Sequence, residues 1–188
     1  LNPKGQFSNM STVTNEVKMM LNPNNNFFSE STENLDRFGA KDIMDLNRIQ
    51  LLNAYSCTEC GRCTSECPAN VTGKKLSPRK IMMDVRDRTE EVGKNIAKNG
   101  SDFQDGKSLL NDFITSEEIW ACTSCNACVE ACPISIDPLS IILELRRYSV
   151  MEESNAPAEL NTVFSNIENN GAPWKFSSSE RLKWKDDE

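Results

Sequence analysis

Two short runs contain all eight cysteines of this 188-residue chain and are its most chemically distinctive feature. The first run, C-T-E-C-G-R-C-T-S-E-C-P, extends from Cys57 to Pro68, and the second, C-T-S-C-N-A-C-V-E-A-C-P, from Cys122 to Pro133. Both have the spacing C-x2-C-x2-C-x3-C-P, which is typical of bacterial proteins that hold two [4Fe–4S] clusters. The repeated spacing therefore predicts two such clusters and a function in electron transfer.

Three cysteines of one run can surround one cluster, and the fourth iron needs a ligand from farther along the chain. In two-cluster proteins with this spacing, the fourth cysteine of each run ligates the other cluster. Pro68 and Pro133, which have no backbone N–H, then redirect the chain after each fourth ligand. The expected ligand sets are Cys57, Cys60, Cys63 and Cys132 for one cluster, and Cys122, Cys125, Cys128 and Cys67 for the other.

The cysteine pattern has other interpretations, and each fits less well. Structural zinc is usually tetrahedral and is bound by separated pairs of ligands, whereas here four cysteines lie within eleven residues, twice. A disulfide framework agrees with the even number of cysteines but is characteristic of small secreted domains. The chain has no histidine, which excludes a Rieske centre because that centre needs two.

Length and composition narrow the class of protein further. The chain is long enough for one domain with tails but too short for two sizeable ones. The net charge of −7 argues against a nucleic-acid partner, because nucleic-acid-binding proteins present basic surfaces. No apolar run approaches the roughly 18 residues of a membrane span. Reduced cysteines indicate a cytoplasmic location. The chain begins at Leu1 rather than Met. We expect a missing N-terminal region or a partner to provide any association with the cytoplasmic face of the membrane.

The sequence predicts helices on both sides of each cysteine run. From about Asp42 to Tyr55, apolar side chains recur at spacings of three, which favours a helix with these residues turned inward. Ser77-Pro78 and Asp137-Pro138 each place a capping residue before proline, the favoured order at a helix start. The first of these two helices should end at Gly100. The expected inward residues are Ile43, Leu46, Ile49 and Leu52, then Ile81, Val85, Val92 and Ile96, then Ile141, Ile142 and Leu145.

The repeat extends beyond the cysteines and predicts a pseudo-two-fold fold. Residues 77–88 align with residues 137–148, and both segments have a capping residue, a proline, an apolar triplet, an acid, an apolar residue and an arginine. A helical stretch over residues 109–114 and 116–120 leads into the second run. Because the 54 residues between the runs read as helix, we expect an all-α fold, an alpha-helical ferredoxin with two helix–cluster loop–helix copies. The first copy has extra length, which we expect to form a surface loop at residues 71–76.

The chain divides into three expected regions. Residues 1–39 should be an irregular arm whose anchors are Phe27 and Phe28, and residues 40–150 the dicluster ferredoxin domain. Residues 151–188 should contain an amphipathic helix, from about residue 157 to 167 and closed at Gly171, followed by a docking tail. The tail places Trp174, Phe176 and Trp184 among polar residues, which suggests docking on this domain or on a partner.

Longer sequence segments carry a family resemblance. The chain resembles the small iron–sulfur subunit of heterodisulfide reductase and a group of bacterial (Fe–S)-binding dicluster proteins. It is also similar to the iron–sulfur portions of glycolate oxidase and anaerobic glycerol-3-phosphate dehydrogenase. The segments that carry this resemblance are N-P-N-N-N at 22–26, T-E-C-G-R-C-T-S-E-C-P-A-N at 58–70, K-K-L-S-P-R-K-I-M-M-D at 74–84, W-A-C-T-S-C-N-A-C-V-E-A-C-P at 120–133 and N-N-G-A-P-W at 169–174.

The motifs and the resemblance together predict an electron-transfer subunit or domain of an oxidoreductase complex. It would relay single electrons between a flavin or iron–sulfur donor and a catalytic partner, and we expect no catalytic residue in the chain itself. The resemblance implies a flavoprotein, a subunit with cysteine-rich CCG domains or a quinone-linked subunit as partner. Two alternatives stay open: a reductase with its own substrate-binding cluster, for which eight cysteines on two cubanes leave no open iron, and a structural scaffold.

Surface charge and two aromatic residues have two interpretations each. Tyr55 and Trp120 each precede a cysteine run by two residues and should shield the clusters from water, rather than carry electrons.

Six basic residues between positions 74 and 88 would attract an acidic redox partner, or would only form a solvated helix face with i,i+4 ion pairs. These basic residues are Lys74, Lys75, Arg79, Lys80, Arg86 and Arg88.

Overall fold

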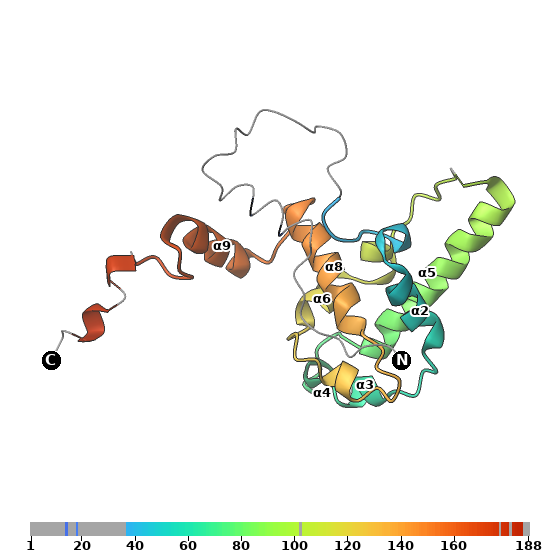
Figure 1. The fold of residues 1–188 in the computed structure, drawn as a ribbon, viewed down its shortest axis with the longest axis horizontal. Helices are drawn as coiled ribbons and strands as arrows, with labels where there is room; N and C mark the ends of the chain where they lie inside the picture. Colours follow the sequence, from blue (N-terminus) through green and yellow to red (C-terminus); the bar gives the residue numbers. More distant parts are fainter. Residues whose placement is uncertain are drawn as a thin grey trace. The chain divides into compact units, whose positions relative to one another are not determined.

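The computed structural model describes residues 37–101, 103–176, 178–180 and 182–185, together with positions 14 and 18. The described residues form helices and connections without any β-strand, so the all-α prediction is confirmed (Figure 1). They divide into two compact units, Leu1–Glu152 and Glu153–Glu188. The expected anchors Phe27 and Phe28 lie outside the described residues, as does nearly all of the expected arm.

The first helical region is divided into two elements, where the sequence predicted one. A 3₁₀ turn, η1 (Ile43–Asp45), precedes α2 (Arg48–Ser56). Asn47 separates them because its backbone is extended and its side chain accepts hydrogen bonds from the N–H groups of Ile49 and Gln50, both at 2.9 Å. Asparagine in this role starts a new helix.

This restart changes which face of the region is buried. Ile43 and Leu46 are buried as expected. Ile49 and Leu52 are each 55% exposed, so their expected inward orientation is wrong. The buried positions of α2 are instead Gln50, Asn53 and Ala54.

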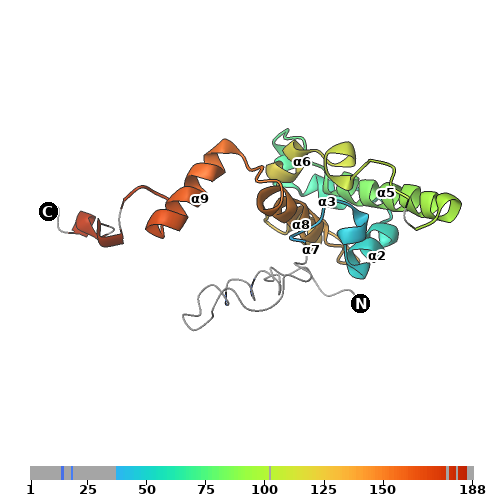
Figure 2. The same ribbon diagram turned by 90° about the horizontal axis from the view of Figure 1, so that it is seen from above.

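The longest helix, α5 (Pro78–Asn99), has the predicted start and end. Ser77 is its N-cap and accepts a hydrogen bond from the N–H of Lys80, Pro78 occupies the first turn, and Gly100 follows the last residue with φ of 94°. Helix α5 packs against α2, α8 and the irregular helical segment η2 (Leu109–Phe113). This helix therefore joins elements of both copies, and its C-terminal part extends beyond the other helices of the first unit (Figure 2).

The second half of the unit repeats the first. Helix α6 (Ser116–Ala121) corresponds to α2, and α8 (Pro138–Met151), which begins at the Asp137 cap, corresponds to α5. The short helices α3 (Arg62–Ser65) and α7 (Ala127–Glu130) lie within the cysteine runs. The equivalent pairs α3–α7 and α5–α8 contact each other, as expected for two copies that face one another.

Apolar residues from both copies form one core. Ile81, Met82 and Val85 of α5 and the expected Ile141, Ile142 and Leu145 of α8 are each at most 1% exposed, which confirms their inward orientation. Burying an aliphatic side chain of this size contributes about 1.5–3 kcal/mol. The extra length of the first copy forms the one-turn helix α4 (Pro68–Val71) and an exposed loop, apart from Leu76, which is buried.

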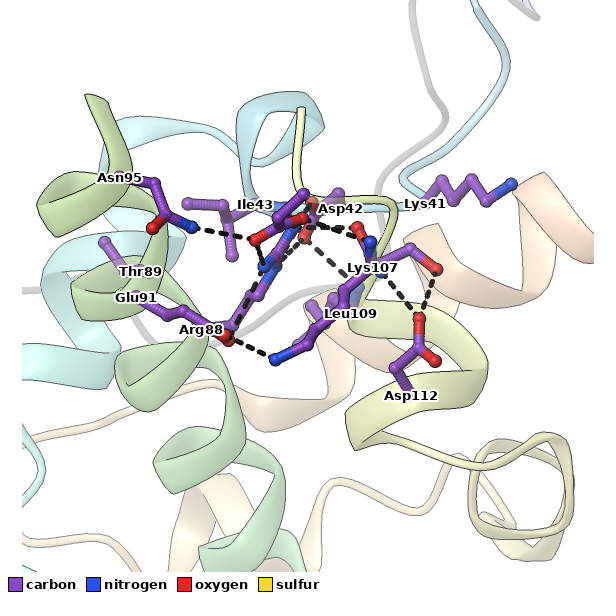
Figure 3. Close-up of polar contacts among 12 residues, drawn as sticks. Lys41, Asp42, Ile43, Arg88, Thr89, Glu91, Asn95, Lys107, Leu109 and Asp112 are labelled. Atoms are coloured by element: carbon purple, nitrogen blue, oxygen red, sulfur yellow. Dashed lines mark hydrogen bonds and ion pairs between the residues drawn. The ribbon is translucent and has the colours of Figure 1, made fainter. Parts of the chain in front are cut away.

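A buried arginine connects three segments of the first unit. Arg88 of α5 is 2% exposed and donates to the carboxylate of Asp42 at 2.7 Å (Figure 3). Arg88 also donates to the carboxylate of Asp105 at 2.6 Å. It also donates to the carbonyl of Lys107 at 2.7 Å. Asp42 in turn accepts from the backbone N–H of Leu109 at 3.1 Å. Arg88 thereby fixes η1 and the 105–109 connection against α5.

The second unit contains α9 (Ala158–Asn170), which ends at Gly171 with φ of 62°. The predicted helix is present and extends three residues beyond the expected residue 167. None of its residues is buried, and Phe164 and Ile167 are 41% and 49% exposed. The tail aromatics are also exposed: Trp174 by 49%, Phe176 by 63% and Trp184 by 74%.

Candidate metal centres

The two cysteine runs have the same backbone course. Cys57 caps the C-terminus of α2, and Cys122 caps that of α6. Each run then has two residues with positive φ, at Glu59 (59°) and Gly61 (83°) in the first run. The second run has them at the equivalent positions, Ser124 (56°) and Asn126 (62°). Alternation of left-handed and right-handed residues turns backbone N–H groups toward one side, an arrangement that many Fe–S sites use.

The first cavity lies between the first run and the end of the second. It is lined by three cysteines of the first run and by Cys128 and Cys132 of the second. Apolar side chains, including Met82 and Ile136, form much of the remaining wall, and exposed Arg79 lies at its edge. The cysteines contributed by the first run are Cys57, Cys60 and Cys63.

The second cavity has the reciprocal composition. Three cysteines of the second run line it together with Cys67, which is buried. Leu76, Leu139 and Ile142 form apolar walls. The cysteines contributed by the second run are Cys122, Cys125 and Cys128, so Cys128 borders both cavities.

All eight cysteines that the sequence predicted as ligands are therefore brought together, four or five to each cavity. The grouping agrees with crossed ligand sets, because Cys67 and Cys132 each lie with the other run. Ligation itself stays a prediction. Within the described part of the chain, no three Cys, Asp, Glu or His side chains are grouped as a site for one metal ion. Four thiols around an apolar cavity match a group that carries four irons.

Burial controls the protonation of these thiols. Loss of water raises the pKa of Cys63 and of Cys122, and raises the pKa of Cys128 to about 12. Neighbouring thiols add to the effect, Cys57 and Cys132 at Cys63, and Cys122, Cys63 and Cys67 at Cys128. The ligating form is the thiolate, so bound iron would displace these protons and supply the compensating charge.

Hydrogen bonds support the second run from outside the cavity. The N–H of Ser124 donates to the sulfur of Cys122 at 3.4 Å. Arg146 of α8 donates to the carbonyl of Ile119 at 2.6 Å and to that of Cys122 at 2.5 Å. Its guanidinium lies over the ring of Trp120, 5.0 Å from the centroid. The sequence pattern assigned Arg146 no function, although the repeat alignment places it opposite Arg86.

The two aromatic residues that precede the runs differ in environment. Trp120 is half-buried and carries the Arg146 guanidinium on its ring. Tyr55 is 50% exposed. Their expected shielding of the clusters stays a prediction.

The basic stretch presents less positive surface than its sequence suggests. Lys80 pairs with Asp84 at 2.6 Å and with Glu118 at 3.0 Å. Arg86 pairs with a carboxylate of the first run, and Arg88 is buried as described above. The exposed members are Lys74, Lys75, Arg79 and the paired Lys80. Lys75 lies 3.6 Å from an exposed Glu117 carboxylate.

Comparison with known proteins agrees with this site. Residues 56–136 match the family model described as a 4Fe-4S dicluster domain. The chain is 35% identical to the probable iron-sulfur-binding oxidoreductase FadF of Bacillus subtilis, over 85% of this chain and 26% of that protein. It is 33% identical to the EtfAB:quinone oxidoreductase of Syntrophomonas wolfei, over 89% of this chain and 26% of that protein. The chain thus spans about a quarter of the length of these two relatives.

A third relative confirms the resemblance to heterodisulfide reductase. It is a component of the ferredoxin/F(420)H(2)-dependent CoB-CoM heterodisulfide reductase of Methanosarcina acetivorans. The identity is 34%, over 60% of this chain and 56% of that component. Among the described residues, no helix has both the length and the apolar character needed to span a membrane.

Proposed function

We propose that this chain, whose residues 56–136 form a 4Fe–4S dicluster domain, is an electron-transfer component of a larger oxidoreductase. It would relay single electrons between a flavin or iron–sulfur donor and a catalytic partner. The observation that carries the proposal is the grouping of all eight cysteines around two cavities that share Cys128 at their border. A [4Fe–4S] cluster on four thiolates supplies reversible one-electron chemistry at potentials that its surroundings set.

The chain's own residues would hold and separate the two groups. Each proposed ligand set takes three cysteines from one run and one from the other, so every iron has a thiolate. The sets are Cys57, Cys60, Cys63 and Cys132, and Cys122, Cys125, Cys128 and Cys67. Complete thiolate ligation leaves no iron open to substrate, which favours a relay over a reductase with its own substrate-binding cluster.

The relatives' names support the kinds of partner. One relative is named for EtfAB and quinone, and another belongs to a heterodisulfide reductase. We therefore infer a flavoprotein, a quinone-linked subunit or a CCG-domain subunit as the redox partner. A cytoplasmic location suits thiolate-bound iron, because that compartment keeps cysteines reduced.

Metal content and turnover of the anaerobically purified chain test the proposal. We expect about eight iron and eight acid-labile sulfide per chain, from two cubanes of four each. We expect reduction by a strong reductant and reoxidation by artificial acceptors, with specific turnover only when a partner is added. Stoichiometric zinc without sulfide, or efficient substrate-specific turnover by the chain alone, would contradict the relay.

A further inference from the structure

The two cysteine runs differ in charge at four pairs of equivalent positions, and at one of these pairs the difference decides what an arginine of the following helix contacts. In the repeat, Arg86 of α5 corresponds to Arg146 of α8, and Glu59 corresponds to Ser124. Arg86 lies 2.5 Å from the Glu59 carboxylate, so the two charges offset each other. Arg146 donates instead to the neutral hydroxyl of Ser124 at 3.3 Å. The second run therefore has a positive charge where the first has an ion pair.

Arg146 is held against the second run by neutral groups. Its other hydrogen bonds go to the carbonyls of Ile119 and Cys122, and its guanidinium lies on the Trp120 ring. Among the described residues, no carboxylate lies within ion-pair distance of it. Arg146 is half-buried. Its charge therefore acts on the second run with little screening.

The other charged residues of the runs and of the cavity walls act less strongly. Arg62, Glu66 and Glu130 also differ between the runs, but all three are exposed. Arg79 borders the first cavity but is exposed, where water and salt screen its charge. Asp137 acts on the Cys128 thiol, yet its carboxylate caps α8 by accepting from the N–H of Ser140 at 3.0 Å. The positive end of the helix dipole partly compensates that carboxylate. The Glu59/Ser124 difference is thus the main electrostatic asymmetry between the runs.

We propose that Arg146 gives the cluster of the Cys122, Cys125, Cys128 and Cys67 set the higher reduction potential, so that electrons move through the chain from the first site to the second. Each transfer adds one electron to the second site and removes the same electron from the first, with no proton or co-reactant. A nearby cation stabilises the added negative charge most when it is desolvated and unpaired. The inference rests on the proposed function and on its ligand sets.

Potentiometric titration followed by electron paramagnetic resonance tests the inference on the two-cluster protein. Ser124→Glu copies the first run into the second, and Glu59→Ser does the reverse; each position already has positive φ in both runs. We expect Ser124→Glu to lower the higher potential by about 59 mV, a tenfold change in a one-electron equilibrium. Glu59→Ser should raise the lower one, and the double variant should bring the two potentials together or reverse their order.

Variants of Arg146 separate its charge from its packing. Arg146→Gln should lower the same potential as Ser124→Glu, whereas Arg146→Lys should keep it near the wild-type value. Lys94→Gln is the matched control, because Lys94 is an exposed cation far along α5 and its loss should leave both potentials unchanged.

Two outcomes would overturn this inference but not the proposed function, provided that the protein retains eight irons. The first is that Ser124→Glu leaves both potentials unchanged. The second is that the potential changed by Ser124→Glu is the lower of the two in the wild-type protein. Absence of two clusters from the wild-type chain would instead overturn the proposed function.

Discussion

Cys67 and Cys132 are the residues that would link the two halves of the domain through the clusters. Each lies in the cavity of the other run, and each precedes a proline that redirects the chain. The cysteine spacing predicted this grouping because two-cluster proteins with the same spacing cross their fourth ligands. The different partners of Arg86 and Arg146 could not be predicted in the same way, since they depend on which loop side chain each arginine reaches.

Replacement of a fourth cysteine should damage the distant site. In Cys67→Ser we expect loss or alteration of the cluster bound by the second run, because Cys67 lines that cavity and not the first. Iron analysis and electron paramagnetic resonance of the reduced protein would measure this, with Cys132→Ser as the reciprocal control. Loss confined to the cluster of the first run in Cys67→Ser would show that ligation is not crossed.

The Asp105 carboxylate should contribute stability throughout the neutral range. Hydrogen bonds from Arg88 hold the pKa of Asp105 at about 2, below its ordinary value near 3.9. A lowered pKa in the folded state stabilises the fold above the unfolded-state pKa, and this stabilisation is lost as the pH falls toward 2. Asp105→Asn should therefore lower the denaturation midpoint equally at pH 6 and pH 8.

Anaerobic denaturation followed by circular dichroism measures that midpoint. Asp112→Asn is a control, because Asp112 only caps the nearby η2 segment through Ser108. If Asp105→Asn lowered the denaturation midpoint at pH 8 but not at pH 6, the result would contradict the low pKa of Asp105.

At the scale of elements, capping residues, prolines and glycines in the sequence predicted where several helices begin or end. α5 and α8 begin at a capping residue followed by proline, and α9 ends at a glycine, as their sequences indicate. The region before the first run was less well predicted, because Asn47 restarts the helix and rotates its buried face. Apolar spacing alone places Ile49 and Leu52 inward, whereas both are half-exposed.

The exposed part of the basic stretch should guide an acidic redox partner. Lys80, Arg86 and Arg88 form internal ion pairs, and Arg79 borders the first cavity. The pair Lys74→Glu/Lys75→Glu is therefore the cleaner test, since only the weak exposed contact of Lys75 with Glu117 is lost. We expect slower electron transfer to a partner.

The loss of rate in this double variant should be largest at low salt, where exposed charges are least screened. Stopped-flow measurement at several salt concentrations, with iron content as a check, would detect it. Lys94→Glu/Lys98→Glu provides an equal change of charge at the far end of α5. Equal rates in the two double variants would leave Lys74 and Lys75 as solvated loop residues without a role in docking.

For the whole molecule, the central claim is that two clusters lie within one helical unit and exchange single electrons with partners. Reductive titration of the anaerobic chain, followed by electron paramagnetic resonance, tests this most directly. We predict uptake of two electrons per chain, one at each site, with magnetic interaction between the reduced sites because Cys128 borders both cavities. Uptake of no electrons by a folded chain that contains zinc and no sulfide would contradict the account.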